Sequence, residues 1–274
     1  MNDKFLKGKG ALITGGASGF GRSAAYSFAE KGADLVLVDI NEELLEETSR
    51  DVEKKTKQKV VPVVCDVSDS KSVKKMADQA FEELDNIYVL FNNAGIATTY
   101  GVDILRIGEK AWDKTINVNL KGQWLVDKFV ARKMNRQTFE PLRGKIIHNS
   151  SHFGISPSPF LPVYSISKAG IISLNNIIAK TLAPYITSNV IAPGFHTTGF
   201  YGNREDITLQ VIHDSNEKTP LNRIGTIEDV VGVILFLASS KSDFITGHCI
   251  TIDGGITEVG VHSHKLDVNI LNLK

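Results

Sequence analysis

Seven short apolar segments recur along the chain, each separated from the next by a longer segment of helical character. These segments are rich in Val, Ile and Leu over most of their length and do not alternate apolar with polar residues. Near-continuous runs of this kind are typical of parallel strands that are covered on both faces. The segments span residues 11–14, 35–39, 60–65, 87–92, 145–150, 188–193 and 248–253. The pattern predicts an α/β fold with a doubly wound parallel sheet of about seven strands and helices on both faces.

The intervening segments carry apolar residues at helical spacing. Helices are expected at residues 19–31, 42–56, 70–84, 109–135, 163–182 and 226–239. Ser68 or Ser70 is the expected cap of the third helix, and Thr226 with Asp229 forms a weaker version of a capping box. No linker or repeat interrupts the series, so residues 1–274 are interpreted as one domain. Residues 195–222 fit neither period and are interpreted as a substrate loop, followed later by a C-terminal tail at 257–274.

Charge and cysteine content restrict the classes of partner. The chain has 31 basic and 31 acidic residues, so no strong field is expected to attract nucleic acid or an anionic membrane. The amino-terminal segment lacks a secretory hydrophobic region and no apolar run reaches about 18 residues, which favours the cytoplasm. Cys65 and Cys249 are expected to be free thiols. His262 and His264 have no further ligands nearby, so no metal site is predicted.

A glycine-rich segment from Thr14 to Gly21 connects the first expected strand to the first helix. Its glycines allow a tight turn and bring a helix amino terminus close to a pyrophosphate, although such turns often serve only as connections. Asp39 ends the second strand, where a carboxylate accepts hydrogen bonds from ribose hydroxyls; the alternative is a solvated strand end or a helix cap. Asp39 would repel a 2′-phosphate, and no Arg or Lys occupies positions 16–18 or 40. NAD is therefore favoured over NADP.

Tyr164 and Lys168 stand four residues apart on an expected helix, so their side chains share one face. A tyrosine with its ordinary pKa of about 10 is a poor base near neutrality, and an adjacent ammonium favours the phenolate. Ser151, at the end of the fifth strand, is suited to hold a substrate oxygen against Tyr164. The set suits proton exchange with a secondary alcohol or ketone during hydride transfer. In isolation, however, a Tyr-x-x-x-Lys pair is more often a surface pair.

The ordered set of motifs resembles the short-chain dehydrogenase/reductase family over roughly residues 5–256. The motifs are TGGASGFG, CDV with Asp66, NNAG at 92–95, NVNL with Asn119, SS with Ser151, YSISK, IAPG at 191–194, Thr198 and DGG at 253–255. Each motif alone is weak, but their order is specific. The resemblance implies a Rossmann fold and an NAD-preferring oxidoreductase. Between Pro184 and Pro193 the chain is one residue shorter than the family pattern and lacks Gly-Ile-Arg, which leaves open where the sixth strand begins.

The resemblance also assigns roles to individual residues. The implied catalytic residues are Asn119, Ser151, Tyr164 and Lys168. Asn119 would keep a water near Lys168 and complete a proton relay, and Lys168 would also bind the nicotinamide ribose. The implied cofactor-binding residues are Gly15, Ser18, Gly19, Phe20, Gly21, Asp39, Asp66, Val67, Asn93, Ala94, Gly95, Tyr164, Lys168, Ile191, Pro193, Gly194 and Thr198. By this resemblance Gly15, Gly19 and Gly21 line the pyrophosphate, Asp39 binds the adenosine ribose, and Asp66 and Val67 flank the adenine. Residues 93–95 form the wall of the crevice, and Ile191, Pro193, Gly194 and Thr198 hold the carboxamide.

Aromatic residues cluster around the expected mouth of the substrate pocket. The expected substrate-binding residues are Ser151, His152, Phe153, Phe195 and Phe200, with Phe160 and Tyr201 nearby. Aromatic walls without a basic cluster predict an uncharged, partly apolar substrate. His152 follows the serine directly; it either faces the substrate or is a packed or solvated histidine. Three functions remain open: a secondary-alcohol dehydrogenase or ketone reductase, a 3-oxoacyl thioester reductase, and an NAD-binding regulator without turnover.

The helices at 109–135 and 163–182 carry apolar residues beyond what one sheet face is expected to cover. These residues are Trp124, Val126, Phe129, Ile171, Ile172, Ile177 and Ile178. Surplus apolar surface of this kind normally marks an interface, and the resemblance implies a homotetramer built through these helices. In the tail, Leu266, Val268 and Ile270 alternate like a strand packed on one side, which predicts docking on a neighbouring subunit.

Overall fold

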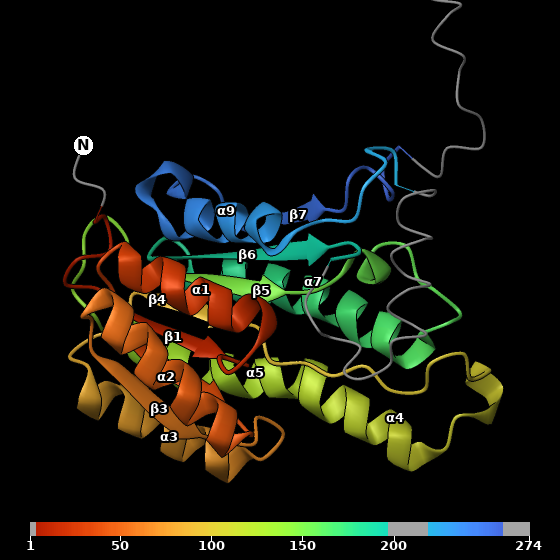
Figure 1. Ribbon diagram of the computed structural model, residues 1–274, viewed down its shortest axis with the longest axis horizontal. Helices are drawn as coiled ribbons and strands as arrows, with labels where there is room; N and C mark the ends of the chain where they lie inside the picture. The colour runs from red at the N-terminus through yellow and green to blue at the C-terminus, as the bar shows by residue number, and fades with distance from the viewer. Residues whose placement is uncertain (1–3, 197–218, 260–274) are drawn as a thin grey trace, which may run out of the picture.

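A seven-stranded parallel sheet lies at the centre of the computed structural model, which describes residues 4–196 and 219–259 (Figure 1). The strand order is β3-β2-β1-β4-β5-β6-β7. The first three strands are added toward one edge of the sheet and the last four toward the other, so the strand order reverses between β1 and β4. The strands are β1 (Gly10–Thr14), β2 (Asp34–Asp39), β3 (Val60–Val64), β4 (Val89–Asn92), β5 (Gly144–Asn149), β6 (Ile186–Pro193) and β7 (Cys249–Ile252). The predicted doubly wound fold is therefore confirmed.

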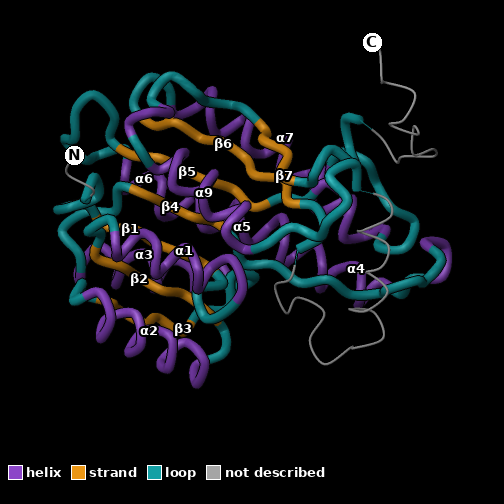
Figure 2. Tube along the Cα trace, turned by 45° about the horizontal axis from the view of Figure 1, so that its top comes forward, coloured by secondary structure: helices purple, strands orange, loops and turns teal. Residues whose placement is uncertain are grey.

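Two apolar layers cover the sheet, one on each face. Successive residues of a strand point to opposite faces, so Ala11 and Ile13 pack in one layer while Leu12 packs in the other. The first layer is completed by α1 (Gly19–Glu30), α2 (Glu42–Thr56) and α9 (Ile227–Ala238). The second layer is completed by α3 (Ser70–Glu83), by the long helical segment between β4 and β5, and by α7 (Pro162–Leu182). Figure 2 shows helices on both sides of the adjacent strands. Because both faces are buried, the strands need no polar alternation.

The helix caps agree with the sequence at one helix and differ at another. Thr226 and Asp229 form a complete capping box at α9, as predicted. For α3, Asp69 is the cap, and its carboxylate accepts hydrogen bonds from the amides of Lys71 and Ser72. The prediction of Ser68 or Ser70 was wrong because Ser68 donates its hydroxyl and its amide to Asp66.

The expected helix at 109–135 is interrupted by two π-helical turns. It consists of α4 (Glu109–Ile116), the π turn η2 (Asn117–Lys121), α5 (Gly122–Val126), the π turn η3 (Asp127–Ala131) and α6 (Arg132–Met134). Short 3₁₀ turns lie at η1 (Ile104–Arg106), η4 (His152–Gly154) and η5 (Ser240–Ser242). Each π turn rotates the following helical residues relative to the sheet, and such turns occur frequently at functional sites.

Two of the residues expected at a subunit interface belong to the interior of the chain. Val126 and Ile171 are both fully buried, so assigning them to surplus surface was wrong. Trp124 and Ile177 remain 43% and 59% exposed. Periodicity alone does not distinguish the two groups, because a helix between a sheet and other helices is apolar over more than one face.

Several sequence interpretations concern residues outside the described ranges. These are most of the loop at 195–222, most of the tail at 257–274, and Thr198, Phe200, Tyr201, His262 and His264. The start of the sixth strand, which the sequence left open between Pro184 and Pro193, lies at Ile186, the first residue of β6. Cys65 and Cys249 are free thiols. Within residues 4–196 and 219–259, no helix has both the length and the apolar character needed to cross a bilayer.

Candidate active site

A cavity of about 750 Å³ lies along the carboxyl ends of the strands. Its walls include residues that follow β1, β2, β3, β4, β5 and β6, so segments far apart in sequence meet there. In open α/β sheets ligands bind at this edge, where the strand order reverses. The geometry of each wall shows what the cavity is able to hold.

The first wall is the glycine-rich turn between β1 and α1. Gly15 has φ of +66°, and a Cβ atom there would lie 2.9 Å from the side-chain nitrogen of Asn93. A Cβ atom at Gly21 would lie 2.0 Å from the carbonyl oxygen of Gly15. Only glycine therefore allows the turn to pack this tightly. Ser18 makes no side-chain capping bond at the start of α1, so the first amides of this helix suit an anion such as a pyrophosphate.

Asp39 forms the second wall, at the end of β2. Its carboxylate accepts a hydrogen bond from the Ala17 amide at 3.2 Å and another from the Asn41 amide at 3.0 Å. These bonds orient the side chain beside the glycine-rich turn. The neighbouring positions 16–18 and 40 hold Gly16, Ala17, Ser18 and Ile40, none of which carries a positive charge. Together the turn and the carboxylate fit the adenosine half of a dinucleotide.

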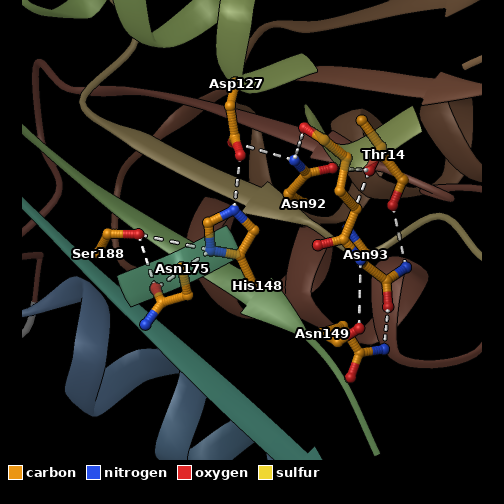
Figure 3. A network of polar contacts seen from close by, with 9 residues as sticks. Thr14, Asn92, Asn93, Asp127, His148, Asn149, Asn175 and Ser188 are labelled. Carbon is orange, nitrogen blue, oxygen red and sulfur yellow. Dashed lines mark hydrogen bonds and ion pairs between the residues drawn. The ribbon is translucent and has the colours of Figure 1, made fainter. Parts of the chain in front are cut away.

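The third wall follows β4 and is fastened to β1 by hydrogen bonds. Thr14 Oγ1 accepts from the amides of Asn93 and Ala94 at 2.9 and 3.0 Å. Asn93 Nδ2 donates to the Thr14 carbonyl at 2.9 Å, and Asn149 Nδ2 donates to Asn93 Oδ1 at 2.8 Å. These contacts fasten the segment that follows β4 to the ends of β1 and β5, and Figure 3 shows Asn93 between Thr14 and Asn149.

Tyr164 and Lys168 lie on α7 with both side chains buried, at 8% and 2% exposure. Lys168 Nζ lies 5.4 Å from the centroid of the Tyr164 ring and donates to the Asn149 carbonyl at 2.8 Å. Burial lowers the pKa of Lys168 from its ordinary value to about 7. The ammonium is thus close enough to influence the tyrosine, and small changes in its surroundings decide its charge near neutrality.

Ser151 caps the 3₁₀ turn η4, and its Oγ accepts a hydrogen bond from the Phe153 amide at 3.2 Å. The preceding Ser150 donates its hydroxyl to the Lys168 carbonyl at 2.7 Å. This bond fastens the end of β5 to the helix that carries Tyr164. Ser151, Tyr164 and Lys168 therefore reach the same cavity from two neighbouring elements.

Asn119 lies behind the cavity wall, in the π turn η2, and is fully buried. Its Oδ1 accepts from the Ile96 amide at 2.8 Å, while its Nδ2 donates to the Ile96 carbonyl at 2.9 Å and to Ser167 Oγ at 3.0 Å. The side-chain amide is thus engaged with protein groups on both ends. Its contacts fasten the segment after β4 to α7, and the predicted role in holding a water stays a prediction.

A buried polar network lies under the end of the sheet that carries these residues (Figure 3). Asp127 and His148 are in contact at 2.9 Å between Oδ2 and Nε2, and both side chains are inaccessible to solvent. Asn92 Nδ2 donates to the other oxygen of Asp127 at 3.1 Å. Asn92 and His148 are the last or next-to-last residues of β4 and β5, directly before Asn93 and Asn149. The network therefore fixes the two strand ends from which the cavity wall begins.

The substrate half of the cavity is walled by His152, Phe153, Phe195 and Leu161. The His152 ring lies 3.9 Å from the Phe153 centroid and makes an edge contact with Phe195 at 4.9 Å. Phe160, expected at the mouth, does not line the cavity and instead lies against Tyr100 at 6.2 Å between ring centroids. Ile191 is also absent from the wall, because its side chain is fully buried in the sheet.

Most residues singled out from the sequence border this cavity. They are Gly15, Ser18, Gly19, Phe20, Asp39, Asp66, Val67, Asn93, Ala94, Gly95, Ser151, His152, Phe153, Tyr164, Lys168, Pro193, Gly194 and Phe195. Gly21 and Asn119 lie behind it, and Thr198 and Phe200 are outside the described residues. Sequence analysis missed Val38, Ile40, Cys65, Ser68, Ile96, Lys114, Asn117, Val118, Asn149, Ser150, Leu161 and His196. Ser68 and Ile96 adjoin recognised motifs, whereas nothing in the spacing marks Lys114 or Leu161.

Comparison with known proteins agrees with this geometry. The family model described as enoyl-(acyl carrier protein) reductase matches residues 15–257. The 3-oxoacyl-[acyl-carrier-protein] reductase of Thermotoga maritima is 38% identical over 92% of this chain and 98% of its own length. The chain is a short-chain dehydrogenase/reductase.

Solved structures show the same family. A putative short-chain alcohol dehydrogenase from Sinorhizobium meliloti matches with a TM-score of 0.85 and 32% identity, covering 94% of this chain and 100% of that one. A xylitol dehydrogenase with bound NAD⁺ matches with a TM-score of 0.83 and 29% identity, covering 91% of this chain and 99% of that one. This short-chain dehydrogenase/reductase is thus an oxidoreductase of a family that uses a nicotinamide dinucleotide, NAD or NADP.

Proposed function

We propose that this chain is an NAD(H)-dependent oxidoreductase that interconverts a secondary alcohol and a ketone on a small uncharged substrate. The observation that carries the proposal is the convergence of Ser151, Tyr164 and Lys168 on one end of the cavity. The other end of the same cavity carries the glycine-rich turn and Asp39. A single cavity thus joins a dinucleotide cradle to a group able to exchange a proton.

The proposed mechanism assigns one role to each of these three residues. The nicotinamide cofactor, when bound, supplies or accepts the hydride. The Tyr164 hydroxyl gives a proton to the substrate oxygen during reduction and takes it back during oxidation. Ser151 Oγ donates a hydrogen bond to that oxygen and holds it against Tyr164. The Lys168 ammonium, held by the Asn149 carbonyl at 2.8 Å, stabilises the phenolate.

Tyr164→Phe tests the proton transfer. The substitution removes the transferable proton and little volume, so kcat should fall by about 10²-fold or more while NADH still binds. Steady-state turnover and NADH fluorescence measure the two effects separately. Lys180→Arg, on an exposed position of the same helix, is the control and should leave both unchanged. Retained turnover in the phenylalanine variant would remove Tyr164 from the mechanism.

The choice of NAD rests on Asp39. A carboxylate oriented by two backbone amides repels a 2′-phosphate, and the adjoining positions offer no positive charge to offset it. NAD should therefore be preferred over NADP by at least about tenfold in kcat/KM, which corresponds to about 1.4 kcal/mol. Asp39→Ala should narrow this difference, because NAD binding weakens and the repulsion disappears. Equal use of both cofactors by the unmodified enzyme would show that the assignment is wrong.

A second candidate function is reduction of a 3-oxoacyl thioester, because the relative from Thermotoga maritima carries that activity in its name. The two candidates are distinguished by assaying acetoacetyl-CoA with NADPH beside small ketones with NADH. Faster turnover of the thioester would favour the second candidate. An NAD-binding regulator without turnover is the remaining alternative, and it predicts cofactor binding with no reaction in either assay.

A further inference from the structure

Asn149 is the last residue of β5 and stands where the hydrogen-bonded ladder between β4 and β5 has ended. The register of these two strands stops at the pair of Asn92 and His148. On its other side β5 stays paired with β6 through Asn149 and Ile191, and the Ser150 amide donates to the Ile191 carbonyl at 2.9 Å. The N–H and C=O of one trans peptide unit point to opposite sides of a strand. The Asn149 carbonyl therefore points toward the β4 side, beyond the last bonded pair of that ladder.

This carbonyl is the acceptor that holds the proposed catalytic lysine. Lys168 Nζ donates to it at 2.8 Å, and Gln123 Nε2 donates to it at 3.2 Å. Within residues 4–196 and 219–259, it is the one hydrogen-bond acceptor of Lys168 Nζ. Burial is the cause that lowers the pKa of Lys168 to about 7, so the charged form has little other stabilisation. The position of the Asn149 carbonyl thus decides where the ammonium lies.

The side chain of Asn149 replaces the missing ladder contact with the segment after β4. Its Nδ2 donates to Asn93 Oδ1 at 2.8 Å, one residue beyond the last paired residue of β4. The direction of this bond is fixed, because Asn93 Nδ2 donates to the carbonyls of Thr14 and Gly15 at 2.9 and 3.3 Å. The oxygen of Asn93 therefore faces Asn149, and only a donor at position 149 satisfies it.

The amide at position 149 is unfavourable in one respect. Its Oδ1 is buried and has no hydrogen-bond partner among the residues that the structure describes. An unpaired buried acceptor destabilises a fold, and an aliphatic residue would fill the end of β5 without it. Ile147, two positions earlier on the same face of the strand, is such a residue. The amide is therefore explained by its donor, which fastens the strand end to Asn93.

We propose that Asn149 is a positioning residue, whose side chain fixes the end of β5 so that its own carbonyl holds the Lys168 ammonium beside Tyr164. The inference rests on the proposed function, in which this ammonium favours the phenolate. Hydrogen bonds run without interruption from the glycine-rich turn through Asn93 and Asn149 to Lys168. Without the amide donor, the end of β5 moves more freely relative to β4, and the ammonium is held less closely.

Asn149→Leu tests the proposal, because leucine is similar in shape to asparagine and lacks the donor. Ionisation of Tyr164 is followed by tyrosinate absorbance in the protein without cofactor, as the difference between each protein and its Tyr164→Phe counterpart. The midpoint should rise by at least about 0.5 pH unit, which is part of the effect of about 1–3 units that an adjacent opposite charge produces. Asn149→Ala removes the same donor with less bulk and should raise the midpoint similarly. An unchanged midpoint in both variants would overturn the proposal.

Ile147→Val is the matched control for loss of packing. Ile147 is fully buried on the same face of β5, and its truncation should lower the urea concentration at the midpoint of unfolding. The Tyr164 titration should nevertheless stay where it is in the unmodified protein. Cooperative urea unfolding shows that each variant is folded. A comparable rise of the titration midpoint in Ile147→Val would mean that any weakening of β5 has this effect, which contradicts a specific role for Asn149.

A double-mutant cycle shows whether Asn149 acts through Asn93. Asn93→Ala removes the acceptor of the same hydrogen bond, so it should also raise the titration midpoint of Tyr164. In that background Asn149→Leu should add less than about half of the shift that it causes alone, because the bond is already absent. Fully additive shifts would contradict the link between the two side chains.

Failure of the inference is distinguishable from failure of the proposed function. The titration uses neither substrate nor cofactor, so it reports the surroundings of Tyr164 whatever the reaction is. If the midpoint shifts as expected but no alcohol or ketone reacts with either cofactor, the proposed function is wrong and the positioning role stands. If alcohols are oxidised and Asn149→Leu changes neither the titration nor the pH dependence of kcat, the inference alone is wrong.

Discussion

At the scale of single residues, Lys168 shows how function and stability oppose each other. Its side chain is 2% exposed, and its amino group donates to a backbone carbonyl. Burial lowers the pKa of Lys168 to about 7, so the folded protein disfavours the charged form that the proposed mechanism requires. Active sites commonly contain groups held in such unfavourable surroundings.

Lys168→Met should therefore stabilise the fold and abolish turnover. The pKa of Lys168 is lower in the folded state than in the unfolded state, where it is about 10.4. The free energy of unfolding is therefore highest above about pH 10.4 and decreases as the pH falls toward 7. The free energy of unfolding of the methionine variant should thus exceed that of the unmodified protein by about 1–4 kcal/mol at pH 6 and by much less at pH 9.5. Urea unfolding at the two pH values measures the difference. The Asn149 carbonyl keeps a donor in Gln123 Nε2 at 3.2 Å.

At the scale of secondary-structure elements, the position of the site depends on how β4 and β5 end. Asp127, on the helical segment between these strands, contacts Asn92 of β4 and His148 of β5. Ser188 of β6 and Asn175 of α7 continue the network on the other side of His148. The buried contacts thus join two neighbouring strands, a third strand and two helices at one level of the sheet (Figure 3). Each strand end passes directly into the cavity wall.

Asp127→Asn should destabilise the protein by about 1–3 kcal/mol, because an amide nitrogen would face either the Asn92 donor or the histidine. In a double-mutant cycle with His148→Asn the coupling energy should exceed about 0.5 kcal/mol, as expected for contacting buried groups. Chemical unfolding supplies the four free energies of unfolding. The surface pair Lys59–Glu83, at 3.0 Å and about half exposed, is the control. Its Lys59→Ala variant should change stability by less than about 1 kcal/mol, and additive effects at 127 and 148 would contradict the coupling.

At the scale of the whole molecule, apolar surface remains on the helical layer that includes α5 and α7. Trp124 on α5 and Ile166 and Ile177 on α7 are each exposed by more than two fifths. Exposed apolar side chains on neighbouring helices mark a contact surface. We propose that a second copy of the chain covers this layer in a twofold-symmetric contact. We also propose that pairs formed in this way associate into a homotetramer with twofold symmetry.

Trp124→Glu combined with Ile177→Glu should lower the mass of the particle in solution, because two carboxylates would be buried in the contact. Sedimentation or light scattering measures the mass. Phe244→Glu is the control, since Phe244 is fully exposed on the turn after α9 and its replacement should leave the mass unchanged. A monomeric unmodified protein would exclude the assembly.

The sequence alone determined the sheet, its parallel direction and the segments that contribute to the cavity. Apolar runs and residue spacings act over a few positions, so Tyr164 and Lys168 are recognisable as neighbours on a helix. In the same way Gly15 is recognisable as the residue after the first strand and Asp39 as the end of the second. Their roles stay predictions, because the chemistry depends on groups brought together only by folding.

Only the tertiary structure decided which atoms lie at the cavity and which are enclosed. Asn119 lies behind the wall because its amide is taken up by Ile96 and Ser167. Val126 and Ile171 are interior because the faces of their helices are covered by distant segments. The lowered pKa of Lys168 and the unpaired nitrogen of His152 likewise arise from burial. Burial and pairing depend on contacts between residues far apart in the chain, and local patterns contain no record of those contacts.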